Sequence, residues 1–151
     1  MRDVHVSNNC VFCRIVQKKL PSSNVYEDDK VLAFMDIRPV NEGHTLVIPK
    51  QHFEGILDIP EELNAYVNKI VKRVAVAVQK ATHADGLSII QQNGKAANQD
   101  VFHLHIHIIP KFEGQNTPRF KDLSEVSREQ LDQTASKIKS HLLPNTNLAE
   151  K

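Results

Sequence analysis

The sequence lacks a net charge strong enough to define its partners. Its 19 Lys and Arg residues nearly balance 18 Asp and Glu residues, which leaves a formal charge of +1 over 151 residues. Nucleic acids and membrane surfaces attract proteins through extended charged surfaces, and a balanced chain offers no such field. We therefore expect no nucleic-acid partner and no membrane partner. Any anion must bind through a local group of side chains.

The sequence also lacks long apolar runs. No segment approaches the roughly 20 consecutive apolar residues of a membrane span, and residues 1–9 lack the apolar core of a secretory signal. No repeat, low-complexity tract or Pro/Gly-rich linker divides the chain, and 40% of its residues are hydrophobic, which is enough for one core. These features predict a single cytoplasmic domain over residues 1–151.

Cysteine is scarce. The only two cysteines, Cys10 and Cys13, lie three positions apart in the segment CVFC. In a reducing compartment this spacing favours metal ligation or redox chemistry over a structural disulfide.

The apolar periodicity of the chain predicts an α+β fold. Residues 60–84 place apolar side chains at three- and four-residue intervals, which is typical of one long amphipathic helix. Ser127 and Gln130 resemble a capping box at the start of a second helix, 128–143. Short apolar or alternating runs predict strands, and their segregation from the helices favours α+β over a doubly wound sheet. The predicted strands are 25–27, 31–36, 44–49, 87–92 and 101–110.

Three of the eight histidines alternate with aliphatic residues in FHLHIHIIP, residues 102–110. In a strand, His103, His105 and His107 would share one face, while the aliphatic residues would share the other face as part of the core. Three imidazoles buried without partners would cost roughly 1 to 3 kcal/mol each. The histidine face is therefore either a metal site, a phosphate site with a nucleophilic histidine, or an exposed strand face.

Three segments together resemble the HIT (histidine triad) family, and most closely its small single-domain microbial members. They are CVFCRIV at 10–16, DIRPVNEGHTLVIPKQH at 36–52 and QDVFHLHIHIIP at 99–110. The resemblance implies an antiparallel five-stranded sheet with one long helix and a C-terminal helix. It places the domain core at about 10–110 and a helical extension at about 127–143. It also implies a homodimer formed by joining two sheets and packing the long helices together.

The resemblance further implies the chemistry of the histidines. In this family the middle histidine attacks the α-phosphate of a nucleotide and forms a covalent nucleotidyl-histidine, and that role falls on His105. The resemblance assigns His107 to phosphate contact and proton handling. An imidazole with a pKa near 6.5 is largely neutral and nucleophilic at cytoplasmic pH, while a neighbouring histidine can carry a proton that offsets phosphate charge.

The resemblance implies roles in substrate binding for four more residues. Gln92 and Gln99 are implied to bind the phosphates or the bridging group, and Asp36 the ribose hydroxyls. His44 is implied to support the phosphate-binding face from behind. Without the motifs, Asp36 would be interpreted as a turn former and the glutamines as solvated loop residues.

The family resemblance also implies two further metal ligands beside the cysteines of the CxxC pair. Zinc-binding branches of the HIT superfamily use two cysteines and two histidines, and the matching residues here are Cys10, Cys13, His52 and His103. A site with four protein ligands has no open position, so this zinc would be structural. Two reduced, unmetallated cysteines and a redox pair are the alternatives.

Two residues depart from the family pattern. Asn98 replaces a residue that is commonly glycine in its loop, which concerns the turn and not the general task of the loop. Many members carry a small hydroxyl residue two places before the aromatic that precedes the triad, whereas this chain has Asp100. An ionised carboxylate accepts hydrogen bonds but cannot donate them, and it would repel phosphate oxygens if it pointed inward. A side chain that pointed to solvent would have no such effect.

These observations predict a nucleotide hydrolase or transferase that acts on purine nucleoside monophosphate conjugates. The conjugate could be a dinucleoside polyphosphate, an aminoacyl-adenylate or a phosphoramidate. One alternative is a nucleotide-binding regulatory module with little catalysis. Another is a metal hydrolase that uses all three triad histidines as ligands.

Overall fold

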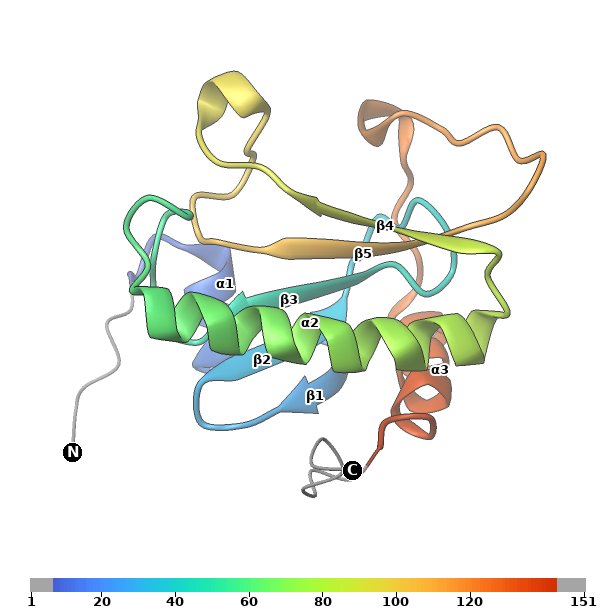
Figure 1. The fold of residues 1–151 in the computed structure, drawn as a ribbon, viewed down its shortest axis with the longest axis horizontal. Helices are drawn as coiled ribbons and strands as arrows, with labels where there is room; N and C mark the ends of the chain where they lie inside the picture. The colour runs from blue at the N-terminus through green and yellow to red at the C-terminus, as the bar shows by residue number, and fades with distance from the viewer. Residues whose placement is uncertain (1–6, 144–151) are drawn as a thin grey trace.

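A computed structural model describes residues 7–143 as one five-stranded sheet flanked by helices (Figure 1). The strand order is β1-β2-β3-β5-β4, and every neighbouring pair is antiparallel. This confirms the predicted α+β fold. The residues on which the expected lack of a secretory signal depends lie mostly outside the described range. The elements are α1 (Val11–Val16), β1 (Asn24–Glu27), β2 (Val31–Met35), β3 (Thr45–Pro49), α2 (Glu61–Thr82), β4 (Gly86–Gln91), η1 (Lys95–Ala97), β5 (Ile106–Lys111), η2 (Phe120–Asp122) and α3 (Arg128–Lys139).

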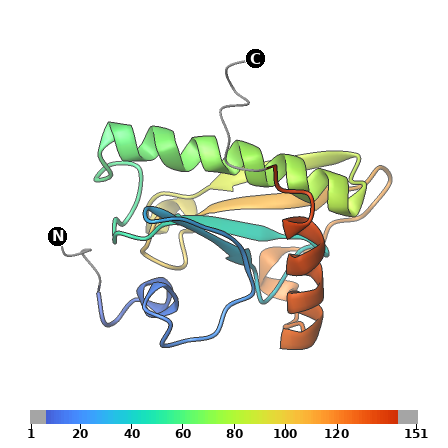
Figure 2. The same cartoon turned by 90° about the horizontal axis from the view of Figure 1, so that it is seen from below.

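The sheet is covered on both faces. Figure 2 shows α2 on one face and α1 on the other, with the strands between them. All residues of β2 and β3 are therefore buried, as expected for strands between two layers. Alternate residues of β2 enter two different clusters: Ala33 packs on the α2 side, and Phe34 packs with Phe12 of α1. The α2 face holds the main core, and the opposite face is left for the candidate site.

Helix α2 forms where the apolar stripe predicted it, with eight buried residues from Val67 to Ala81. Its N-cap is Pro60, whose missing N–H would have no helical partner in any case. The helix ends at Thr82 because His83 adopts a left-handed conformation (φ 56°) and its N–H donates to the Gln79 carbonyl. No helix among residues 7–143 is long and apolar enough to cross a membrane.

The histidine segment departs from the predicted strand 101–110. Strand β5 begins only at Ile106, so His103 and His105 lie before the sheet, with His103 in a bend. The N–H of Leu104 donates to the Phe53 carbonyl at 2.7 Å instead of to a neighbouring strand. The alternation nevertheless holds, because Leu104 and Ile106 lie in the α2-side core.

Helix α3 is shorter than predicted. It begins where expected, since Ser127 is its N-cap and accepts a hydrogen bond from the Gln130 N–H at 3.2 Å. It ends at Lys139 instead of residue 143. Its buried residues include Leu131, Ala135 and Ile138, which join the main core.

Candidate active site

A cavity of about 380 Å³ opens on the α1 side of the sheet. One part of its wall is apolar and includes Phe12, Phe34 and Leu46. Another part carries the two predicted catalytic histidines, His105 and His107. A cavity with apolar walls and a few convergent polar groups is the usual form of a small-molecule site.

His105 is held in one tautomer. Its Nδ1 atom lies 2.8 Å from the carbonyl oxygen of His103, which can only accept a hydrogen bond. We therefore assign the proton of the neutral ring to Nδ1, which leaves a lone pair on Nε2. The ring is only 4% exposed and packs against Phe12, with ring centroids 5.1 Å apart. His105 thus has the form that a nucleophile needs.

A second ring, His44, fixes the tautomer of His107. The Val40 N–H donates to Nδ1 of His44 at 3.0 Å, so the proton of neutral His44 is on Nε2. That Nε2 atom lies 2.9 Å from Nδ1 of His107. His107 therefore accepts at Nδ1 and carries its own proton on Nε2. The sequence predicted support from His44 but not this direct contact.

Burial keeps both rings of this pair neutral. It lowers the pKa of His44 to about 3 and the pKa of His107 to about 4. In the absence of substrate, the neighbours of His105 are therefore neutral, and the expectation that one of them carries a proton beside a phosphate stays a prediction. His107 can instead donate a hydrogen bond from its Nε2–H group.

Asp36 combines a turn role with a place in the cavity wall. One carboxylate oxygen accepts from the Arg38 N–H at 2.9 Å, which is the turn interaction. The other oxygen lies 3.4 Å from Nε2 of His44. Burial raises the pKa of the Asp36 carboxyl, and the charge of Asp100 adds to this effect.

The two glutamines are not among the described residues that line the cavity. The amide of Gln99 is buried and bonded to backbone: it accepts from Gly94 N–H at 2.7 Å and donates to the carbonyls of Glu54 and Val101. In this structure the hydrogen-bonding groups of Gln99 hold the loop, and its phosphate contact stays a prediction. Gln92 is half-buried just after β4, and its substrate contact stays a prediction.

Asp100 lies beside His105. Its Oδ1 atom is 3.4 Å from Nε2 of His105, although 77% of the side chain is exposed. The interaction with His105 is the main reason that the pKa of this carboxyl falls to about 2. A hydrogen bond to the carboxylate requires a proton on Nε2, so it belongs to the protonated ring and not to the neutral ring that carries a lone pair there. The carboxylate thus points to the histidine and is reached by solvent, which settles the two orientations that the sequence left open.

The four predicted metal ligands meet next to this cavity. One ligand atom from each of Cys10, Cys13, His52 and His103 lies within 4.8 Å of all the others. Nδ1 of His103 is 3.4 Å from the Cys10 sulfur and 3.5 Å from the Cys13 sulfur, and Nδ1 of His52 is 3.2 Å from the Cys13 sulfur. A tetrahedral zinc ion with ordinary bond lengths holds sulfur and nitrogen ligands about 3.6 Å apart. The spacing of these residues fits that ion.

The surroundings of His103 also fit a metal. Its Nε2 atom lies 2.8 Å from the Pro49 carbonyl, which places the proton there and leaves Nδ1 for a cation. Burial raises the pKa of the Cys13 thiol to about 11. A bound cation would favour the thiolate and lower that pKa.

The three triad histidines do not converge on one ion. His103 belongs to the cysteine cluster, and His107 belongs to a separate cluster with Asp36 and His44. In that second cluster the Nδ1 lone pair of His107 already accepts a hydrogen bond from His44. Among residues 7–143, the geometry thus offers no site of the three-histidine metal hydrolase.

Three aromatic residues of the cavity wall, Phe12, Phe34 and Phe120, were not predicted as site residues. Phe120 of η2 lines the cavity, and its ring centroid lies 5.6 Å from that of His107 and 6.4 Å from that of His44. It comes from a stretch between β5 and α3 in which no strand or helix was predicted. Its position depends on how the chain folds back over the histidines.

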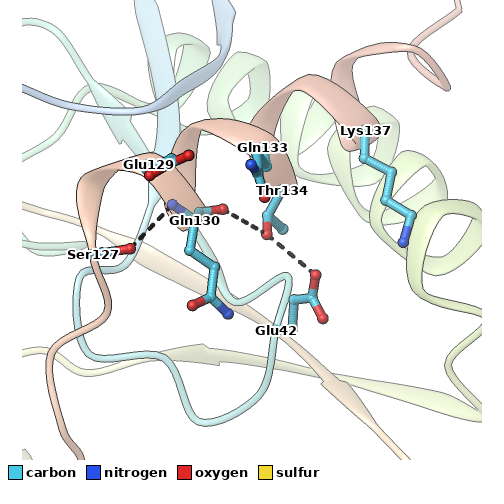
Figure 3. A pocket seen from close by; sticks show the side chains of 7 residues that line it. All are labelled: Glu42, Ser127, Glu129, Gln130, Gln133, Thr134 and Lys137. Atoms are coloured by element: carbon cyan, nitrogen blue, oxygen red, sulfur yellow. Dashed lines mark hydrogen bonds between the residues drawn. The ribbon is translucent and has the colours of Figure 1, made fainter.

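A second hollow, of about 500 Å³, lies between Glu42 and α3 (Figure 3). Thr134 bridges its sides by hydrogen bonds to the Glu42 carboxylate and the Gln130 carbonyl. Its walls hold neither a histidine nor a cysteine. The cavity at His105 is therefore the candidate active site.

Curated relatives match most of the chain. An uncharacterised HIT-like protein from Methanocaldococcus jannaschii is 42% identical over 130 residues, which cover 86% of this chain and 98% of that protein. An adenosine 5'-monophosphoramidase from Saccharomyces cerevisiae is 43% identical over 68% of this chain and 62% of its own length. An adenylylsulfatase from Arabidopsis thaliana is 40% identical over 72% of this chain and 55% of its own length.

Solved structures share the fold. A HIT-like protein from Bartonella henselae matches with a TM-score of 0.83 and 44% identity, over 90% of this chain and 98% of that chain. A zinc-bound histidine triad protein from Mycobacterium smegmatis matches with a TM-score of 0.78 and 36% identity, over 88% and 92%. The HIT domain model matches residues 17–114. With the triad, the sheet and these matches in agreement, the chain belongs to the HIT (histidine triad) domain family.

Proposed function

We propose that this protein cleaves purine nucleoside monophosphate conjugates at the α-phosphate through a covalent nucleotidyl intermediate on His105. The observation that carries the proposal is the hydrogen bond from His105 Nδ1 to the His103 carbonyl, 2.8 Å long. In the neutral ring it leaves the lone pair on Nε2, which lies beside Asp100 in a residue that lines a cavity. Such a position is what attack on phosphorus requires.

The proposed reaction has two steps. In the first, Nε2 of His105 forms a bond to the α-phosphorus, and the bond from phosphorus to the leaving group breaks. The leaving group departs with the electron pair and takes up a proton. In the second, water or another acceptor attacks the same phosphorus, and the phosphorus–nitrogen bond breaks. Division into two displacements lets a weak nucleophile act on an activated intermediate.

His107 supplies the second ring. Because His44 donates to its Nδ1 atom, the Nε2–H group of His107 is free to donate to a phosphoryl oxygen or to the leaving group. A phosphate beside this ring would favour its protonated form and make proton transfer easier. His44 acts through His107 and is a positioning residue.

The remaining substrate contacts are also part of the proposal. Asp36 would bind the ribose hydroxyls through the carboxylate oxygen that is not used in its turn. Gln92 and Gln99 keep their predicted phosphate contacts, and Gln99 also holds the loop that precedes the triad.

Two relatives favour this substrate class. One is named an adenosine 5'-monophosphoramidase and the other an adenylylsulfatase. Both names describe AMP joined to another group, although each relative is longer than the part that this chain matches. We therefore propose AMP conjugates as the first substrates to test.

We also propose that Cys10, Cys13, His52 and His103 hold a structural zinc ion. The spacing of their ligand atoms and the zinc-bound relative from M. smegmatis support this. Zinc would join α1 to the segment before β5 and to the end of β3, and would keep the base of the catalytic segment in place.

The proposed assembly is a homodimer. Strand β4 has a strand partner only on its β5 side within residues 7–143, and Ile89 on it is 49% exposed. An uncovered edge strand is a template for pairing with a second copy. We further propose that residues 1–151 form one domain and that the protein works in the cytoplasm, where its thiols stay reduced.

Turnover of a panel of adenosine and guanosine conjugates tests the main proposal. Wild-type protein should release AMP or GMP and should form a covalent nucleotidyl adduct that mass spectrometry detects. His105→Ala should abolish the adduct and lower turnover by about a thousandfold or more. His141→Ala, which changes an exposed histidine after α3, is the matched control. Tight nucleotide binding without adduct or turnover would instead indicate a regulatory module.

A further inference from the structure

Asp100 places a negative charge where the proposed reaction begins. Its Oδ1 atom lies 3.4 Å from Nε2 of His105, and the Val101 N–H donates to the same oxygen at 2.8 Å. The backbone bond holds the carboxylate in this orientation, so its exposure does not make it a freely moving surface group. Within residues 7–143, it is the carboxylate that lies within ion-pair distance of His105.

The negative charge of Asp100 acts on the leaving group of the proposed reaction. Any substrate must bring its α-phosphorus to covalent distance from Nε2, and the first atoms of the leaving group follow it into the cavity. These atoms come within one Debye length of Asp100, which is roughly 8 Å at physiological salt, so salt does not fully screen its charge. Because 77% of the Asp100 side chain is exposed, a leaving group that extends toward solvent can reach it.

Repulsion of the α-phosphate itself does not affect this comparison. Every substrate of the proposed class carries that phosphate, so its repulsion by Asp100 is a shared cost that cancels between two substrates. The charge of the leaving group does not cancel. A positive group gains attraction from the carboxylate, and a polyphosphate chain gains repulsion.

The nearby cations do not neutralise Asp100. Arg38 and Arg128 also line the cavity. Arg38 lies 3.7 Å from Glu125, and Arg128 donates to the Ser23 hydroxyl at 2.9 Å. Arg38 thus shares its charge with a carboxylate and Arg128 contacts a neutral hydroxyl, and among the described residues neither arginine forms an ion pair with Asp100.

We propose that Asp100 is a specificity residue that selects leaving groups by charge. It favours conjugates in which AMP is joined to a neutral or positively charged amine, and it disfavours conjugates whose leaving group is anionic, such as polyphosphates. This inference rests on the proposed function, since it concerns the leaving group of that reaction.

Three phosphoramidates of AMP, matched in length, test the proposal. The amine is ethylenediamine, propylamine or β-alanine, so the free end of the leaving group is positive, neutral or negative near neutral pH. For the wild type, we expect kcat/KM for the positive conjugate to exceed that for the negative one by about tenfold or more at low salt. Asp100→Asn should bring that ratio to within about threefold, mainly by improving the negative conjugate.

Two controls separate selectivity from general damage. Asp100→Asn keeps a side-chain oxygen that accepts from the Val101 N–H, and Asp100→Ser provides a second uncharged variant. Glu61→Gln removes an equal charge from the first turn of α2, on the opposite face of the sheet, and should keep the wild-type ratio. A merely structural role would lower kcat/KM for all three conjugates by the same factor. That result would overturn the proposal, as would a wild type without charge preference.

A binding measurement keeps this test separate from the test of catalysis. The neutral conjugate alone reports on the proposed function, since its turnover should depend on His105. If it is not turned over, calorimetric Kd values for the three conjugates still decide the role of Asp100. We expect His105→Asn protein to bind the positive conjugate most tightly, and the double variant His105→Asn/Asp100→Asn to lose this order. The same order of Kd values in both variants would refute charge selection.

Discussion

Nε2 of His44 lies 2.9 Å from Nδ1 of His107, and the two residues are 63 positions apart in the chain. The contact continues a chain of hydrogen bonds that starts at the Val40 N–H, 3.0 Å from Nδ1 of His44. Each bond fixes the proton of the next ring, so a backbone N–H decides which nitrogen of His107 is a donor. Loss of any member would leave the tautomer of His107 undetermined.

His44→Leu should therefore impair catalysis more than binding. We expect kcat to fall by about tenfold or more with little change in KM, because the proton of His107 is no longer held on Nε2. The buried Val40 N–H also loses its acceptor, which should cost about 1 to 3 kcal/mol of unfolding free energy. Nitrogen NMR of His107 would report the tautomer directly. A single Nε2–H tautomer that persists in the variant would contradict the proposed role of His44.

The buried histidine pair should make stability depend on pH. Burial holds the pKa of His44 at about 3 and that of His107 at about 4 in the folded protein, whereas both are near 6.5 when unfolded. Below about pH 6.5 these two histidines bind protons in the unfolded chain but stay neutral in the folded protein. The free energy of unfolding therefore falls as pH falls. Each ring contributes a slope of up to about 1.4 kcal/mol per pH unit. Urea unfolding between about pH 5 and pH 7 measures this slope, and His44→Leu should reduce it.

Removal of the proposed zinc should destabilise the fold without removing the nucleophile. Cys13→Ser, or exhaustive chelation of the wild type, should lower the melting temperature by at least about 5 °C, since a ligand that binds only the folded state stabilises it. Metal analysis should find about one zinc per chain in the wild type and less in the variant. An unchanged melting temperature together with no bound zinc would refute the metal site.

The exposed edge of β4 should control assembly. Ile89→Lys places a charge on the uncovered strand, and natural proteins block edge pairing in this way. We expect sedimentation to change from a dimer to a monomer. Ile56→Lys is the matched control, because Ile56 is similarly exposed, at 47%, in the loop before α2. A monomeric wild type would contradict the proposed dimer.

Much of the fold was predictable because periodicity reports which side chains share a face. The stripe that became α2 and the Ser127 cap of α3 needed no tertiary information. The start of β5 could not be predicted in this way. Alternation occurs in any extended chain, whereas a strand also needs a neighbour, and β4 ends with Gln91 opposite Ile106.

For the candidate site too, some features could be predicted from the sequence and others only from the tertiary structure. The histidine spacing and the CxxC pair identified the candidate side chains from the sequence alone, and the resemblance to the HIT family implied that His103 serves the cysteines while His105 and His107 serve the substrate. Only the tertiary structure decided their partners. The register of β3 against β5, with Leu46 opposite His107, brings His44 to the triad. The loop before the triad turns Asp100 toward His105 and binds the amide of Gln99 to backbone. The physical reason is that a sequence pattern specifies the face on which a side chain lies, whereas its tautomer, charge partner and hydrogen bonds depend on residues brought near it by folding.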